Sequence, residues 1–153
     1  MKASLKPRIL PGAALGLLLA LLLPWSAAAA PRDGLDNAIV TYLAAGPIEN
    51  FLLQPEALPD DPGDEFYLVF DVRSPAEVEE GGLLPGAVHV PYTDIDPLLD
   101  ALAGDHSQPV LVYCQTMLRS TQVVMALRLL GYENAWYLAG GIDRWRAAGK
   151  PLE

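Results

Sequence analysis

The side chain best suited to chemistry in this sequence is the thiol of Cys114, the only cysteine among 153 residues. It follows the apolar run Val110 to Tyr113 and precedes a segment with helical spacing. A thiol between a buried strand and a helix N-terminus faces backbone N–H groups and the positive end of the helix dipole. Such a field favours the thiolate, which is the nucleophilic form of cysteine. We therefore expect Cys114 to react.

A second polar side chain ends another strand-like segment. The continuous apolar run from Phe66 to Phe70 stops at Asp71. Runs of this length that are apolar on both faces are typical of parallel sheets. Ligands of such sheets bind at the carboxyl ends of the strands. Asp71 and Cys114 are therefore expected to lie close together, at the mouth of one binding site on the carboxyl edge of the sheet.

The elements that position these residues alternate along the chain. Ser74, Pro75 and Glu77 have the spacing of a capped helix start, with Glu77 completing a capping box. Apolar spacing and Gly or Pro boundaries predict helices over 36–45, 54–58, 75–81, 94–103, 120–130 and 141–148, strands over 66–70, 87–90, 110–113 and 135–138, and a solvated acidic loop over 59–65. This alternation predicts an α/β fold, a central parallel sheet flanked by helices.

The first thirty residues have the composition of an export signal. Basic residues within the first eight positions precede the apolar run from Gly12 to Leu23, and a small-residue cleavage zone spans 26–30. We expect cleavage after Ala28 or Ala29, which leaves a periplasmic or secreted protein with no membrane attachment; an uncleaved anchor is the alternative. The expected divisions are a signal peptide over 1–29, a helical lead-in over 30–58 and the α/β domain over 59–153.

The charge balance is strongly acidic. The formal net charge is −9, and without the three basic residues of the signal, seven basic side chains stand against 19 acidic ones, so it becomes −12. This balance argues against nucleic acid or anionic lipid as a partner. A lone cysteine also excludes an internal disulfide, although an exported chain meets an oxidising compartment.

Three segments, in order along the chain, resemble the signatures of a single-domain rhodanese, a sulfurtransferase module that carries sulfur as a cysteine persulfide. They are 71–78 (DVRSPAEV), 82–91 (GLLPGAVHVP) and 131–145 (GYENAWYLAGGIDRW). The resemblance covers about residues 53–152, with Cys114 at the expected place. The stretch 41–58 also resembles the lead-in of exported rhodanese-like proteins.

The resemblance implies a thiosulfate-type sulfurtransferase with Cys114 as the nucleophile and with no metal or organic cofactor. Amides of the loop would stabilise the thiolate or persulfide anion. Arg119 would meet thiosulfate or another small anionic donor, and Asp71 would hold Arg119 by a charge-assisted hydrogen bond. A thiophilic acceptor such as cyanide or a protein thiol would take the sulfur. The implied loop residues are Gln115, Thr116, Met117, Leu118, Arg119 and Ser120.

Two positions depart from the family pattern. Rhodanese loops commonly have Cys-x-x-Gly-x-Arg, and Met117 stands at the glycine. If that position needs a positive φ, methionine costs about 1 kcal/mol. Leu83 stands where the family often has histidine. These departures support an alternative, a non-catalytic binding or sulfur-relay module whose activity Met117→Gly would restore.

A cysteine phosphatase or arsenate reductase is the third alternative. Those enzymes have Cys-x5-Arg loops, whereas four residues separate Cys114 from Arg119. The tighter loop suits a sulfur atom better than a tetrahedral phosphate. The remaining conspicuous side chains are interpreted as structural: Arg73, His89, Trp136 and Trp145.

Overall fold

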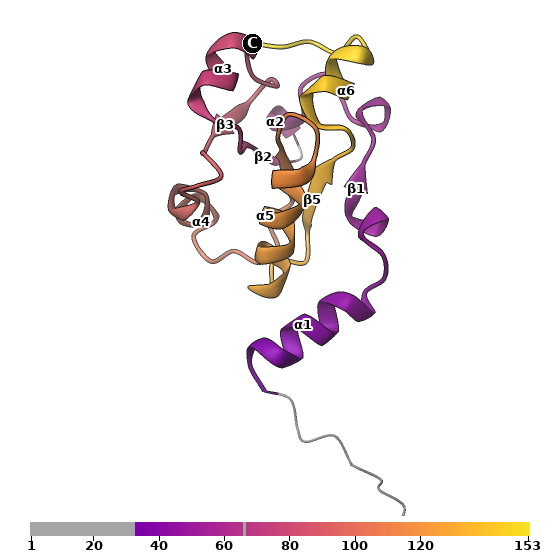
Figure 1. The fold of residues 1–153 in the computed structure, drawn as a ribbon, viewed down its shortest axis with the longest axis vertical. Coiled ribbons are helices and arrows are strands. Elements are labelled where there is room, and N and C mark those ends of the chain that lie inside the picture. Colours follow the sequence, from indigo (N-terminus) through magenta and orange to yellow (C-terminus); the bar gives the residue numbers. More distant parts are fainter. Residues whose placement is uncertain (1–32, 66) are drawn as a thin grey trace, which may run out of the picture. The chain divides into compact units, whose positions relative to one another are not determined.

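Strands and helices alternate in the computed structural model, which describes residues 33–65 and 67–153. Within these residues, five strands form one sheet in the order β1-β5-β4-β2-β3, and every neighbouring pair is parallel (Figure 1). The α/β fold with a central parallel sheet is confirmed. The strands are β1 (Leu52–Leu53), β2 (Leu68–Asp71), β3 (Ala87–His89), β4 (Val110–Tyr113) and β5 (Ala135–Leu138).

The helices follow the predicted pattern with small shifts at their ends. They are α1 (Leu35–Ala44), α2 (Pro62–Glu65), α3 (Pro75–Gly81), α4 (Asp96–Leu102), α5 (Leu118–Leu129) and α6 (Gly141–Ala147), with 3-10 turns at Ile48–Phe51 and Pro55–Ala57. The expected loop over 59–65 contains the one-turn helix α2. Asp61 explains it, because its carboxylate accepts the amides of Gly63 and Asp64, each at 3.1 Å.

Two apolar clusters place helices on both faces of the sheet. One cluster joins alternate residues of β4 to α4 and α5, and includes Val112, Cys114 and Leu127. The other joins the intervening residues of β4 to α6, and includes Tyr113 and Trp145. The alternation follows from the period of two along a strand. Cys114 therefore belongs to the face that α5 covers.

The strand order creates a crevice at the middle of the sheet. Central β4 pairs with β2, and Tyr113 is opposite Asp71. After β2 the chain moves to β3 on one side, and after β4 it moves to β5 on the other. Where the connections after two neighbouring strands run in opposite directions, a crevice that can bind a ligand forms between them. Asp71 and Cys114 lie at this switch point.

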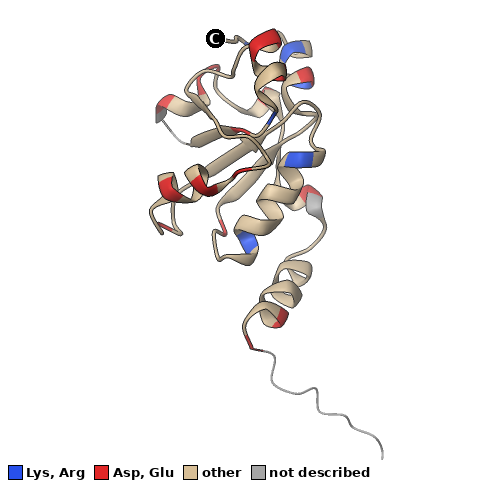
Figure 2. Ribbon diagram, turned by 60° about the vertical axis from the view of Figure 1, so that its left-hand side comes forward, with Lys and Arg blue, Asp and Glu red and all other residues tan. Residues whose placement is uncertain are grey.

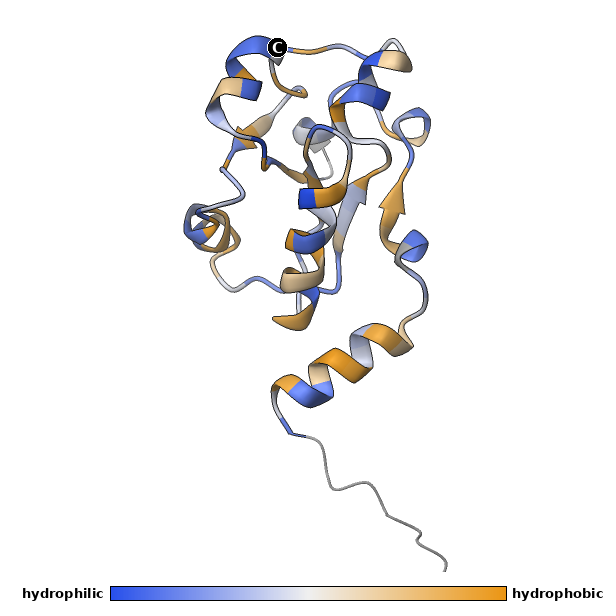
Figure 3. Cartoon of the chain, in the orientation of Figure 1, coloured by the Kyte–Doolittle hydropathy of each residue, from blue (hydrophilic) through white to orange (hydrophobic). Residues whose placement is uncertain are grey.

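The N-terminal end of the described chain is the least buried. Helix α1 packs on α5 but has no buried residue, and its apolar side chains Leu35 and Leu43 are exposed (Figure 3). Strand β1, which precedes residue 59, forms an edge of the sheet. The expected signal peptide lies outside the described residues. Within the described part, no helix has the length and apolarity needed to cross a membrane.

Candidate functional site

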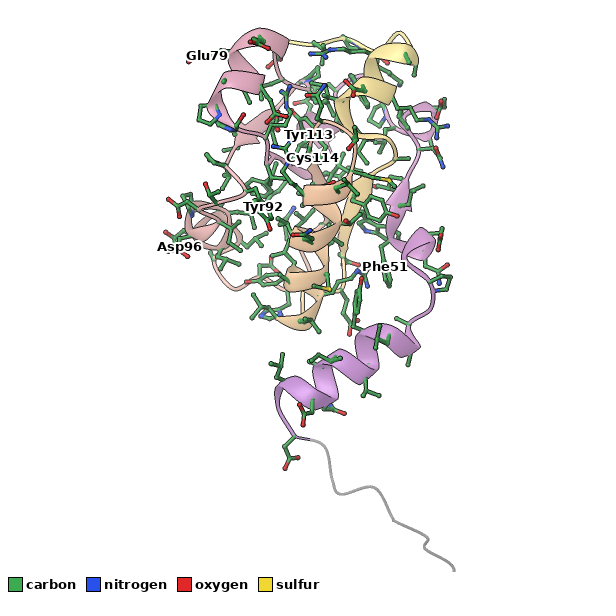
Figure 4. All side chains as sticks on the ribbon, in the orientation of Figure 1. Phe51, Glu79, Tyr92, Asp96, Tyr113 and Cys114 are labelled. Atoms are coloured by element: carbon green, nitrogen blue, oxygen red, sulfur yellow. The ribbon has the colours of Figure 1, made fainter. Side chains whose placement is uncertain are left out.

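Cys114 directly follows β4 and lies beside the first turn of α5 (Figure 4). Its side chain is only 1% exposed. The thiol donates to Oγ of Ser120 at 3.7 Å, and that hydroxyl donates in turn to the carbonyl of Met117 at 3.0 Å. Ser120 is itself fully buried. The sulfur is thus held in a small polar niche inside an apolar core.

The loop after Cys114 presents a series of main-chain donors. Within residues 33–65 and 67–153, the amides from Gln115 to Ser120 donate to no protein acceptor, and the amide of Thr121 is the first to close the helix, onto Met117 at 2.9 Å. The first N–H groups of a helix have no intrahelical acceptor and attract anions. The loop can therefore stabilise negative charge on a sulfur near its centre.

The start of α6 clamps the other side of this loop. Amides of Ile142 and Asp143 donate to the carbonyls of Cys114 and Gln115 at 3.0 and 3.2 Å, and the Gln115 side chain donates to the Asp143 carboxylate. Gly141 has φ +60°, and a Cβ there would lie 2.6 Å from the carbonyl oxygen of Gln115. Only glycine allows this close approach. The clamp keeps the carbonyls turned away from the donors of the loop.

Arg119 is held by Glu77, a residue of α3. Its Nη1 and Nη2 donate to Oε2 and Oε1 of that carboxylate at 2.7 and 2.6 Å. Hydrogen bonds from Arg119 hold the pKa of Glu77 well below its usual range, and Ser74 adds to the effect. The same bonds, together with contact with Cys114, raise the pKa of Arg119. Both groups therefore stay charged at any physiological pH.

The expected bond from Asp71 to Arg119 is wrong. Asp71 and Arg73 are both fully buried and form an ion pair, in which Nη2 lies 2.5 Å from Oδ2. Arg73 also donates to the carbonyls of Glu77 and Gly82 at 3.0 and 2.5 Å. Asp71 turns toward Arg73 because this buried guanidinium needs a charged partner. Asp71 is thus linked to Arg119 only indirectly: it binds Arg73, which donates to the main chain of α3, and α3 carries Glu77.

The two departures from the family pattern have no visible cost. Met117 has φ 167°, an extended value that any residue adopts, so the strain expected there is absent. The main chain of Leu83 pairs with Glu153, with N–O distances of 2.8 and 2.9 Å. The structural interpretations of His89 and Trp145 hold: His89 contacts the carbonyl of Arg73 at 2.9 Å, and Trp145 is buried. Trp136, by contrast, is only half-buried.

The predicted loop residues come together around Cys114, but with unequal exposure. Ser120 is buried, Gln115 and Arg119 are half-buried, and Thr116, Met117 and Leu118 face solvent. A hollow of about 530 Å³ opens beside the loop, lined by Glu77, Glu80, Gly81, Gln115 and Arg146; we call it the α3–α6 hollow. Among the described residues, no group of three or more His, Cys, Asp or Glu is placed to hold a metal ion.

Sequence reasoning missed two contributors to the site. Glu77 was recognised only as a helix-capping residue, yet its Oε2 accepts from Ser74 and Arg119 at once. Gly141 entered only as the first residue of the helix predicted over 141–148. The pairing of Glu77 with Arg119 has no local sequence signal, since 42 residues separate the two. The same holds for the close approach of Gly141 to Gln115. The capping box itself is present as predicted.

A family model described as the rhodanese-like domain matches residues 54–148. The thiosulfate sulfurtransferase GlpE of Actinobacillus succinogenes is 31% identical over 101 residues, which are 66% of this chain and 88% of that protein. An uncharacterized protein, YqhL, of Bacillus subtilis is 34% identical over 77 residues, 50% of this chain and 59% of its own length. The chain spans 59% of the length of YqhL and of a second uncharacterized relative, slr1261 of Synechocystis.

Solved structures agree with this match. A rhodanese-related protein from Thermoplasma volcanium superposes with a TM-score of 0.57 at 26% identity, covering 66% of this chain and 95% of that one. A Rhodopseudomonas palustris protein of unknown function, named as a possible tyrosine phosphatase, superposes with a TM-score of 0.61 at 21% identity, covering 80% and 96%. The second likeness, at this low identity, concerns the fold alone.

Proposed function

Since this chain belongs to the family of rhodanese-like domains, we propose that it is a sulfurtransferase that forms a persulfide on Cys114 and passes the sulfur to a thiophilic acceptor. One observation carries the proposal. The thiol lies at the start of a loop whose amides from Gln115 to Ser120 have no acceptor within the described residues. Unused donors around a nucleophile are suited to an anion that forms during the reaction.

The chemistry needs only groups of this chain, a donor and an acceptor. The Cys114 thiolate attacks the outer sulfur of the donor, an Sγ–S bond forms, and the former carrier of that sulfur leaves with the electron pair. The resulting persulfide anion is held by the loop amides. The acceptor then attacks the outer sulfur and regenerates the Cys114 thiolate. Ser120 supports the cycle, because its hydroxyl can turn from Met117 toward the charged sulfur.

The N-terminal sequence bears on the cellular location of the protein. We propose that the protein is exported, supported by the basic, apolar and small-residue segments of the first thirty residues. N-terminal sequencing of the protein from a periplasmic or culture fraction is expected to begin at Ala29 or Ala30. An intact N-terminus in the membrane fraction would favour the uncleaved anchor instead.

Intact-mass measurement of sulfur loading tests the proposed activity. Reduced protein is incubated with thiosulfate or with glutathione persulfide, desalted and weighed. We expect a gain of one sulfur atom that cyanide then removes as thiocyanate. Cys114→Ser is the control and should gain nothing. If wild type and Cys114→Ser gain the same mass with both donors, the proposal is wrong and the non-catalytic binding module replaces it.

The same samples address the phosphatase alternative. The loop has four residues between Cys114 and Arg119, one fewer than phosphatase loops have. We expect no hydrolysis of an aryl phosphate above the level of Cys114→Ser. Cys114-dependent hydrolysis would return the phosphatase to consideration.

A further inference from the structure

Arg119, the cation expected to meet an anionic donor, is not free. Both of its terminal nitrogens donate to the carboxylate of Glu77, at 2.6 and 2.7 Å. That carboxylate is held in place by Ser74, whose amide and hydroxyl donate to it at 2.9 and 2.7 Å. The pair thus presents no net charge to a ligand at the mouth.

The other basic side chains do not supply the missing charge. Arg73 is buried against Asp71, and Arg146 lies 3.8 Å from Asp143 while donating to the carbonyl of Gly81. Arg144 and Lys150 also have carboxylate partners. Within the described residues, Arg128 is the one basic side chain without a carboxylate partner. It lies in the last turn of α5, at the opposite end of the helix from Arg119, and stacks on the ring of Phe51. Basic positions are few on this chain (Figure 2).

Acidic groups line the hollow beside the loop that follows Cys114 instead. The α3–α6 hollow is lined by Glu77, by Glu80 and by the already paired Arg146. Glu80 is exposed and has no ion-pair partner among the described residues. All 19 acidic residues of the sequence follow the first thirty residues. A ligand therefore enters a neutral to negative field.

This field separates two classes of sulfur donor. Thiosulfate is a dianion. The loop amides can stabilise only the negative charge on the outer sulfur that approaches Cys114. Its sulfonate charge would remain at the mouth, where desolvating an anion without a counter-ion is costly. A cysteine persulfide carries at most one charge, on the sulfur itself. Its remaining body is free to be neutral or basic, which suits this mouth.

We propose that the donor to Cys114 is a cysteine persulfide with neutral or basic surroundings rather than thiosulfate, and that Glu77 determines this preference by neutralising Arg119. The inference rests on the proposed sulfurtransferase function. The Cys114 thiolate attacks the outer sulfur of R–S–SH, the Sγ–S bond forms and the S–S bond of the donor breaks. The thiolate that leaves takes up the proton, so R–SH and the Cys114 persulfide anion result.

Glu77→Gln is the decisive variant. Glutamine is also accepted at this capping position, so α3 should keep its start while Arg119 regains its charge. Glu79→Gln is the matched control, since Glu79 lies on the same helix at its outer side, away from Cys114 (Figure 4). Sulfur-loading rates are measured by intact mass with thiosulfate and with the persulfide of N-acetylcysteine amide, a cysteine derivative that has no carboxylate.

In the wild type, we expect the persulfide of N-acetylcysteine amide to load Cys114 at least about tenfold faster than thiosulfate, a difference of about 1.4 kcal/mol. Glu77→Gln should raise the ratio of the thiosulfate rate to the persulfide rate about tenfold, whereas Glu79→Gln should leave both rates unchanged. Equal wild-type rates, or an unchanged ratio of rates in Glu77→Gln, would overturn the preference while leaving the sulfurtransferase standing. Loading by neither donor would overturn both proposals.

The source of the persulfide is resolved by two synthetic peptides. Each has a central cysteine persulfide, flanked by arginines in one and by glutamates in the other. We expect the Arg-flanked peptide to load Cys114 faster than both the Glu-flanked peptide and the persulfide of N-acetylcysteine amide, with the advantage shrinking at high salt. A persulfide on a polypeptide is then the favoured source. Faster loading by the Glu-flanked peptide would contradict the charge argument.

Discussion

The guanidinium of Arg119 and the carboxylate of Glu77 meet side by side, with two N–O contacts of 2.6 and 2.7 Å between α5 and α3. Both side chains are about one-third exposed, at 30% and 32%. The pair joins the loop around Cys114 to the capped start of α3, so the same carboxylate serves the fold and the site.

This ion pair predicts a pH-dependent contribution to stability. Because the pKa of Glu77 lies below its ordinary value of 4.5, the stabilisation is present above that value and is lost as the pH falls toward the lowered one. Urea unfolding of wild type and Glu77→Gln should differ by about 1 kcal/mol near neutral pH, a modest value because solvent screens the pair. The difference should shrink at about pH 3. A difference that stays constant with pH would contradict the assignment.

Asp71→Asn should be strongly destabilising. It leaves the fully buried guanidinium of Arg73 without a counter-charge, at an expected cost of about 3–5 kcal/mol. Asp94→Asn, at an exposed position, is the control and should change stability by less than about 0.5 kcal/mol. Urea unfolding followed by circular dichroism measures both. Similar midpoints for the two variants would show that the buried pair is unimportant.

Gly141→Ala should damage the site as well as the fold. Its new Cβ would lie 2.6 Å from the carbonyl oxygen of Gln115, so the loop after Cys114 must shift. Gly104→Ala is a matched control, because Gly104 also has a positive φ, +75°, but nothing within 4 Å of a new Cβ. We expect Gly141→Ala to cost about 1–3 kcal/mol more than the control and to slow sulfur loading. Equal effects would mean that only backbone strain matters.

Ser120→Ala should slow formation of the persulfide without unfolding the protein. Its hydroxyl accepts a hydrogen bond from the Cys114 thiol, with an Sγ–Oγ distance of 3.7 Å. Losing one hydrogen bond of about 0.5–1.5 kcal/mol predicts a loading rate about two- to tenfold lower. Thr121→Ala removes a comparable hydroxyl, which donates to the carbonyl of Leu118 at 2.9 Å, and should load at the wild-type rate. If both variants slow equally, the effect belongs to the start of α5.

Most of the fold was predictable because its signals are local. Strands β4 and β5 begin and end where apolar runs predict, and α3 begins at its capping box. The 3-10 turn Ile48–Phe51, β1 and α2 were not predicted, and the last two have identifiable physical reasons. Strand β1 has only two residues, too few for a pattern, and α2 depends on the side chain of Asp61 within an acidic segment.

By itself, the sequence determined that a thiol ends a central parallel strand ahead of a helix, because apolar runs, caps and glycines act over a few residues. Only the tertiary structure decided which charges meet. Asp71 forms an ion pair with Arg73, and Arg119 pairs with Glu77, which is 42 residues away in the sequence. The physical reason is that the crossover from β2 through α3 brings the start of α3 against the start of α5. The buried guanidinium of Arg73 needs a counter-charge and takes Asp71, while the partly exposed guanidinium of Arg119 pairs with Glu77. The backbone at Met117 is likewise known only from the structure, with φ 167° in place of the expected strain.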